Sequence, residues 1–146
     1  MCGRFTQQYT WKELVDLYNL TNPHILNLRP NWTVAPTQDV GVVVPEDSGR
    51  IYKTMRWGLV PMWAKDVKIG NQAINARLDT VATKPMFRSA WKSRRCLIPA
   101  SGYFGWREVR GISAQKKLAK MPFYVTRKDG VPLTFAGLHD PNDGSH

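Results

Sequence analysis

The sequence predicts an α+β fold, a single domain of curved antiparallel β-sheets with short helices, over residues 1–146. Three observations lead to this class. Strand-like stretches outnumber helical ones, turn residues separate them at short intervals, and the regular helical crossovers that a parallel sheet needs are missing. The chain is also long enough to bury one sizeable hydrophobic core.

One helix is predicted near the N-terminus. Thr10 and Glu13 have the spacing of a capping box, in which each side chain accepts the backbone N–H of the other residue. We expect a helix over about 11–19, ended by Asn22-Pro23. Its apolar face, at helical spacing, consists of Trp11, Leu14, Val15 and Tyr18.

A β-hairpin is predicted after an extended loop. Two prolines within residues 26–37 favour the loop. The β-branched run VGVVV at 40–44 predicts a buried strand, and residues 46–49 predict a turn. Residues 50–57 alternate loosely and complete the hairpin.

The middle of the chain mixes irregular and strand-like stretches. Residues 57–66 are aromatic and interrupted by Gly and Pro. Residues 74–87 predict a loop followed by a short helix that begins near Asp79 or Thr80. Residues 94–109 are the strongest β stretch.

Two further strands are predicted near the C-terminus. The lysine-rich residues 110–121 predict a hairpin loop. Strands are expected at 122–127 and 133–139, around a turn at 128–130. The tail from residue 140 onward is expected to be loop.

The charge balance indicates the kind of partner. There are 21 Lys and Arg against 11 Asp and Glu, a net charge of +10 that favours nucleic acid or another anionic surface. Six Trp, five Tyr and five Phe among these cations favour single-stranded nucleic acid, because bases stack on rings while phosphates meet cations. The alternative is a basic surface without such a partner, and we expect at least half of the aromatic residues in the core.

Other classes of protein are not expected. The two cysteines, Cys2 and Cys96, form no Cys-x-x-Cys motif and the three histidines are scattered, so we expect no metal and no cofactor. No apolar run approaches about 20 residues and no signal peptide is evident, so no membrane partner is expected. A cytoplasmic location, on the nucleoid in a bacterium, fits a free thiol at Cys2.

Cys2 has the most informative position in the chain. Removal of Met1 from the opening MCGRF would give Cys2 a free α-amine beside its thiol. The ordinary pKa values are about 7.7–8.0 for the amine and about 8.5 for the thiol, so a useful fraction of the amine is unprotonated and nucleophilic near neutral pH. An aminothiol condenses with an aldehyde and closes to a thiazolidine, and the opened sugar of an abasic site in DNA is such an aldehyde. A hydrolase that uses the thiol, a redox thiol and a merely tolerated residue are the alternatives.

Seven stretches carry a resemblance to a known family. In chain order they are MCGRF (1–5), VAPTQ (34–38), RWGLVPMWAKD (56–66), INARLDT (74–80), MFRSAW (86–91), RRCLIPASGYFGW (94–106) and FAGLHD (135–140). With these motifs the chain resembles the SRAP family, the SOS-response-associated peptidase or abasic-site-processing proteins. The resemblance extends over essentially the whole chain.

The resemblance implies a fold, an activity and partners. Family members lose Met1, bind single-stranded DNA in a basic groove and crosslink Cys2 to abasic sites as a thiazolidine, which shields the lesion during the DNA damage response. The implied fold is one domain of curved antiparallel sheets in an open barrel. The peptidase label refers to removal of the residue before the cysteine, and the crosslinking is lyase-like. The implied partners are single-stranded DNA and abasic-site DNA, with the oligomeric state left open.

The resemblance also implies roles for individual residues. Cys2 corresponds to the nucleophile, and Asn75 to the asparagine beside it. By their residue types alone, Asn75 also fits a turn, Arg77 an ion pair with Asp79, and the tryptophans core packing. The implied DNA-binding residues are Arg4, Trp57, Pro61, Trp63, Arg77 and Arg88.

The sequence departs from the family pattern in three places. Gly105 stands where the family usually has a glutamate, and Glu108 should face the other side of the strand. The family's later histidine followed by Arg-Met-Pro does not occur, so we expect a domain shortened at its C-terminus with an open sheet edge. Thr33 replaces the usual asparagine before Val-Ala-Pro.

These departures affect the expected chemistry. General acid/base groups contribute about 10²–10⁴-fold, so crosslinking without the glutamate and the histidine is expected to be slow. The main alternative is a catalytically impaired remnant of the family that only binds single-stranded DNA. A weaker alternative is an N-terminal nucleophile cysteine peptidase.

Overall fold

The computed structural model describes residues 2–110 and 118–141. The described residues form eight strands, two α-helices and one 3₁₀ helix. In chain order these are β1 (Phe5–Gln7), α1 (Trp11–Tyr18), β2 (Asn31–Val34), β3 (Asp39–Glu46), β4 (Gly49–Arg56), η1 (Val67–Gln72), α2 (Arg88–Ser93), β5 (Arg95–Ala100), β6 (Gly102–Arg110), β7 (Leu118–Val125) and β8 (Leu133–Leu138).

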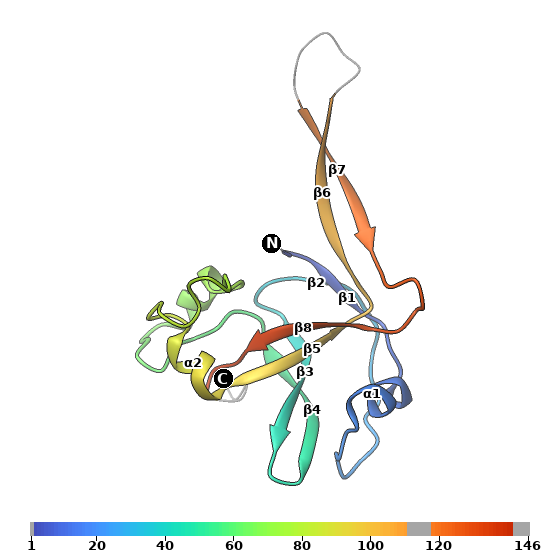
Figure 1. The fold of residues 1–146 in the computed structure, drawn as a ribbon, viewed down its shortest axis with the longest axis vertical. Coiled ribbons are helices and arrows are strands. Elements are labelled where there is room, and N and C mark those ends of the chain that lie inside the picture. The colour runs from blue at the N-terminus through green and yellow to red at the C-terminus, as the bar shows by residue number, and fades with distance from the viewer. Residues whose placement is uncertain (1, 111–117, 142–146) are drawn as a thin grey trace.

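The strands form two antiparallel four-stranded sheets (Figure 1). One sheet has the order β2-β1-β6-β7 and the other the order β4-β3-β5-β8, and they do not close into a barrel. The long hairpin of β6 and β7 projects from the body, and the connection that holds η1 and α2 lies beside the second sheet (Figure 1). The predicted α+β class with antiparallel sheets and short helices is confirmed.

Helix α1 forms where the capping box predicts it. Thr10 Oγ1 accepts the Glu13 N–H at 3.2 Å, and Glu13 Oε2 accepts the Thr10 N–H at 2.6 Å. The apolar face of the helix packs against β3 and β4. The helix ends at Asn19 and not at Asn22-Pro23, because Asn19 adopts the left-handed conformation with φ 53° that closes helices.

The hairpin of β3 and β4 is confirmed, whereas the strand before it was missed. The register pairs Glu46 with Gly49 and leaves a two-residue turn. Residues 31–34, predicted as loop, form β2 and pair with β1. The neighbouring prolines lie outside this edge strand, where their missing N–H groups break no ladder hydrogen bond.

The strong β stretch at 94–109 is two strands in different sheets. β5 ends at Ala100 and β6 begins at Gly102. The chain crosses between the sheets at Ser101, whose N–H donates to Thr6 O at 2.8 Å. Hydrophobicity alone gives no sign of this crossing, because apolar residues occur in both strands.

The two C-terminal strands are present as β7 and β8, and they also belong to different sheets. β7 begins at Leu118, so part of the loop predicted at 110–121 is strand. The rest of that prediction, residues 111–117, lies outside the described residues, as does the end of the predicted tail, residues 142–146.

The short helix predicted within 74–87 is wrong. Residues 78–83 form turns, and a hydrogen bond from Lys84 N–H to Thr80 O at 2.9 Å closes one of them. Pro85 has no N–H with which to continue a helix. The next helix after η1 is α2, which begins at Arg88.

The side chain of Gln7 joins the two sheets. Gln7 belongs to β1 and is 8% exposed. Its Nε2 donates to Gly41 O and Pro99 O, both at 2.9 Å, and its Oε1 accepts the Gly41 N–H at 2.9 Å. Gly41 and Pro99 belong to β3 and β5 of the other sheet. One buried amide thus makes three hydrogen bonds between the sheets.

The main hydrophobic core combines residues of both sheets. Its buried members are Phe5, Val34, Val40, Val42, Val44, Met55, Cys96 and Ala100. Most aromatic residues are buried or half-buried, as expected from the sequence. The exposed ones are Trp32, Trp63, Trp106, Phe123 and Tyr124.

Replacement of Gln7 by methionine should destabilise the fold. The change keeps the shape of the side chain but leaves three buried backbone groups unpaired, at about 1–3 kcal/mol each. We expect a loss of about 3 kcal/mol or more in the free energy of unfolding, measured by urea denaturation. The exposed Gln72→Met is the control. Equal stability of the two variants would contradict the role given to Gln7.

Candidate active site around Cys2

Cys2 lies in the short segment before β1 and is held against the main core. Its side chain is half-buried and packs on the cluster that contains Phe5. The thiol donates to Arg4 O at 3.2 Å. The same carbonyl accepts the Phe104 N–H at 3.0 Å, so the thiol is connected to β6. Residues this close to a chain terminus are usually loosely held, whereas these contacts give Cys2 a defined place.

Burial decides the protonation state of the thiol. Desolvation raises the pKa of Cys2 above its ordinary value, because the charged thiolate loses hydration. The hydrogen bond to Arg4 O also uses the thiol proton. Cys2 is therefore a neutral thiol near pH 7, suited to react in a second step and not as a standing thiolate.

Asn75 meets Cys2 in the structure. Its side-chain Nδ2 donates to Cys2 O at 3.0 Å, although the two residues are 73 positions apart. Asn75 lies in the irregular segment between η1 and α2 and is half-buried. The side chain thus makes a tertiary contact, which a purely local turn-forming role does not require.

Trp57 lies behind this contact. Its indole Nε1 donates to Ile74 O at 2.8 Å, one residue before Asn75. Its ring packs on Phe5 with ring centroids 5.1 Å apart. Trp57 is half-buried and so fits the packing alternative better than an exposed DNA-facing surface, and Pro61 is buried.

The arginines assigned to DNA are exposed. Arg4 precedes β1, and Arg88 is the first residue of α2. Arg77 pairs with Asp79, with 2.9 Å from Nη2 to Oδ2, as the ion-pair alternative expects. The guanidinium lowers the pKa of Asp79 by this hydrogen bond. Arg77 therefore stays charged, but its guanidinium is already paired with a neighbouring carboxylate.

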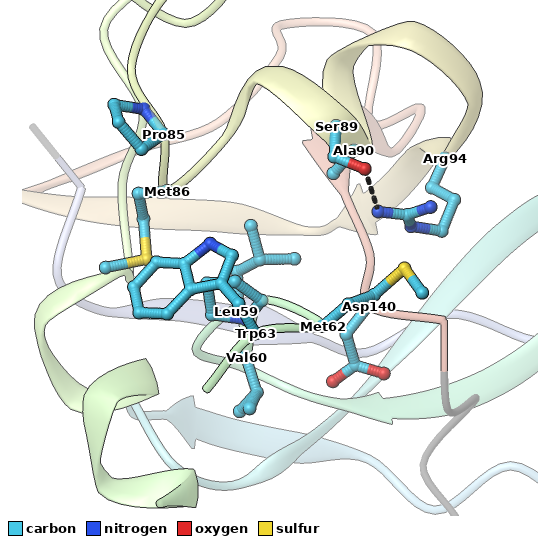
Figure 2. Close-up of a pocket in the computed structure, with 11 residues that line it drawn as sticks. Leu59, Val60, Met62, Trp63, Pro85, Met86, Ser89, Ala90, Arg94 and Asp140 are labelled. Atoms are coloured by element: carbon cyan, nitrogen blue, oxygen red, sulfur yellow. Dashed lines mark hydrogen bonds between the residues drawn. The ribbon is translucent and has the colours of Figure 1, made fainter. Parts of the chain in front are cut away.

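Trp63 belongs to a separate small cavity of about 70 Å³ (Figure 2). Trp63 and Met62 are 58% and 71% exposed at its rim. Among the other lining residues, Arg94 Nη2 donates to Ser89 Oγ at 3.0 Å (Figure 2). Cys2 does not line this cavity. The structure thus brings Cys2 and Asn75 together and leaves Trp63 on a neighbouring surface.

The face of β6 that carries Gly105 is covered by a ring. Gly105 lies opposite Phe123, and a Cβ at Gly105 would come within 2.3 Å of that ring. An aromatic ring over a cross-strand glycine is a known way to fill such a gap in a sheet. Glu108 pairs with Lys120 in the same unbroken register and lies on the opposite face, as predicted.

Within residues 2–110 and 118–141, no three His, Cys, Asp or Glu side chains are grouped to hold a metal ion. Burial raises the pKa of the Cys96 thiol to about 12, so Cys96 is much less reactive than Cys2. No helix of the described part of the chain is long and apolar enough to cross a membrane.

Two contributions to the site were missed from the sequence. Gln7, at the end of β1, and the indole N–H of Trp57 both act through backbone carbonyls that are distant in sequence. The one available signal was Gln7 itself, a polar residue close to the MCGRF motif in a stretch where the sequence predicts no strand. It did not indicate which atoms the side chain would reach.

The chain belongs to the SRAP family, described as SOS response associated peptidase, whose profile matches residues 1–145. Abasic site processing protein YoaM of Bacillus subtilis is 34% identical over 141 residues, which are 96% of this chain and 60% of that protein. Abasic site processing protein YedK of Escherichia coli is 30% identical over 142 residues, 94% of this chain and 59% of that protein. The chain thus spans about 60% of the length of these relatives.

Solved structures agree with the fold. A protein from Bacteroides thetaiotaomicron matches 99% of this chain and 64% of its own, with a TM-score of 0.75 and 24% identity. A phage-related protein from Bordetella bronchiseptica matches 94% of this chain and 60% of its own, with a TM-score of 0.67 and 26% identity. The two-sheet arrangement is therefore shared with known folded proteins.

Alkylation should distinguish the two thiols. Iodoacetamide should modify Cys2 and spare Cys96 in the folded protein between pH 6 and 9, because Cys96 is buried with a pKa of about 12. The midpoint of the Cys2 rate against pH should lie above that of an exposed cysteine, since burial raises its pKa. Mass spectrometry of peptides measures both rates. A Cys2 midpoint below the ordinary value would contradict the desolvated site.

Proposed function

We propose that this protein binds single-stranded DNA and forms a thiazolidine crosslink between Cys2 and abasic sites. The contact between Asn75 and the main chain of Cys2 carries the proposal, because it fixes an otherwise terminal aminothiol. Membership of the SRAP family and relatives named abasic site processing proteins support it. The reaction needs a free thiol, which a reducing compartment such as the cytoplasm maintains.

The proposed reaction proceeds in three balanced steps. Water first hydrolyses the Met1–Cys2 peptide bond, releasing methionine and a free α-amine. The unprotonated amine then adds to the aldehyde carbon of the opened abasic sugar, and loss of water gives an imine. Finally the Cys2 sulfur bonds to the imine carbon, and the thiol proton ends on nitrogen. The resulting five-membered ring joins the protein to DNA.

The residues around Cys2 suit these steps. The Asn75 amide holds the Cys2 carbonyl and so fixes the direction of the amine and the thiol. The neutral thiol leaves the amine to attack first, because a desolvated thiolate is disfavoured. Until the ring closes, Arg4 O accepts the hydrogen bond of the Cys2 thiol and so keeps the sulfur oriented.

DNA binding is assigned to exposed cations and apolar side chains. Arg4, Arg77 and Arg88 are exposed and suit phosphate contacts. Trp63, with Met62 beside it, presents an exposed surface on which a base can stack. The net charge of +10 supplies the general attraction to the DNA backbone.

A second candidate function is DNA binding without the covalent step. The observation that favours it is the Phe123 ring over Gly105, where the family resemblance implies a carboxylate. Without this acid/base group the reaction rate falls by about 10²–10⁴-fold. The two functions differ in whether a covalent product accumulates.

The test of the proposed function is a denaturing gel with an oligonucleotide that carries one abasic site. We expect a heat-stable shifted band with the protein and with Cys96→Ala, and none with Cys2→Ala. Cys2→Ser keeps the amine and should give a band only when cyanoborohydride reduces the imine. Binding of the oligonucleotide without any Cys2-dependent band would favour the second candidate, and absence of binding would overturn both.

The ion pair of Arg77 gives a separate prediction for DNA affinity. Asp79→Asn frees the guanidinium and should tighten binding of a single-stranded oligonucleotide by about two- to fivefold. Arg77→Ala should weaken binding and reduce the slope of log K against log salt by about 0.7. Fluorescence anisotropy over a salt series measures both.

The chain contains a matched control for this experiment. Arg127 and Asp129 form an ion pair with the same spacing in the turn between β7 and β8. Asp129→Asn adds the same net charge, so the excess effect of Asp79→Asn reports local contact. Equal effects of the two substitutions would remove Arg77 from the DNA-binding surface.

A further inference from the structure

We infer that Trp57 is a positioning residue that sets the Asn75 amide against Cys2, and that it does so through its indole N–H. This inference deepens the proposed function and rests on it for its catalytic consequence. It assigns to Trp57 a task other than contact with DNA.

Trp57 makes a hydrogen bond to the segment that carries Asn75. Residues 73–77 lie outside helix and strand, so no regular ladder fixes their carbonyl groups. Trp57 Nε1 donates to Ile74 O at 2.8 Å, and the Leu59 N–H donates to Ala73 O at 3.2 Å. The peptide that precedes Asn75 is therefore oriented by the indole.

Trp57 also contacts the strand that follows Cys2. The Trp57 ring packs on Phe5 at 5.1 Å with the planes tilted by 59°. Phe5 is 3% exposed and is the first residue of β1, three positions after Cys2. Trp57 thus touches both segments that meet at the Asn75–Cys2 hydrogen bond.

Trp57 itself is fixed. The backbone N–H of Trp57 donates to Gln38 O at 2.8 Å, and the backbone carbonyl of Trp57 accepts the Thr37 N–H at 2.9 Å. The ring therefore stands on a backbone held by two hydrogen bonds. The contacts form a closed circuit from Trp57 through the Asn75 segment to Cys2, along the chain to Phe5 and back to the ring.

Loss of the indole donor opens this circuit at one point. The Ile74 peptide is then free to rotate, and the Asn75 amide that follows it loses its fixed direction toward Cys2. Misplacement of reacting groups by about 1 Å costs up to about a hundredfold in rate. Contact with DNA is unaffected, because the ring is half-buried and is not the exposed tryptophan of this region.

The test replaces Trp57 by phenylalanine, which keeps an aromatic ring but has no donor. The first readout is hydrogen exchange of the Asn75 side-chain amide by NMR without DNA, assigned by its loss in Asn75→Asp. We expect exchange at least tenfold faster in Trp57→Phe. The second readout is the crosslinking rate at saturating abasic oligonucleotide, which we expect to fall about ten- to a hundredfold.

The control is Trp32→Phe, which alters an exposed ring that the proposed function does not use. It should leave Asn75 exchange, the saturating rate and the oligonucleotide concentration at half-saturation unchanged. Trp57→Phe should lower the saturating rate, with half-saturation within twofold of the unsubstituted protein. A change in half-saturation with an unchanged saturating rate in Trp57→Phe would overturn the inference.

Two further outcomes are also decisive. If Trp57→Phe unfolds, benzothienylalanine at position 57 keeps the size and shape of the ring with sulfur in place of the N–H. If the unsubstituted protein forms no crosslink, the proposed function fails, and the inference is judged by Asn75 exchange alone. Unchanged Asn75 exchange in a folded variant without the donor overturns the positioning role.

Discussion

The structure depends on the anchoring of β1, a strand of only three residues. β1 pairs with β2 and β6 in one sheet, while the amide of Gln7 reaches β3 and β5 in the other. Thr6, beside it, contacts the Tyr124 hydroxyl of β7 at 2.6 Å. Because buried polar groups are costly when unpaired, these side chains fix the register and depth of the strand. Cys2 takes its place from this anchor.

Glycines allow the close approach of these elements. A Cβ at Gly41 would lie 1.8 Å from the Tyr52 hydroxyl, and one at Gly102 would lie 2.5 Å from the Tyr124 ring. The space that a side chain would use is taken by a ring from a neighbouring strand, as at Gly105. Ring and glycine therefore act as one packing unit, and neither can change alone without displacing the strand.

The aromatic residues have two separate tasks. Rings such as Trp57 and Phe5 hold together the segments that meet at Cys2. Trp63 is exposed on the neighbouring surface. The same motif, RWGLVPMWAKD, contributes both tryptophans, so a single stretch of sequence supplies packing behind the site and an accessible surface beside it. Gly58 and Pro61 lie between the two tryptophans and allow the chain to change direction there.

The sequence by itself determined the α+β class, the capping box of α1 and the hairpin of β3 and β4, and it indicated Cys2 and Asn75 as candidate site residues. These features depend on local patterns and on a specific ordered set of motifs. The tertiary structure decided the crossing at Ser101, the turns at 78–83 in place of the predicted short helix, and the partners of Gln7 and Trp57. Those outcomes depend on which backbone carbonyl lies within 3 Å of a donor, a distance fixed by packing between residues remote in the chain.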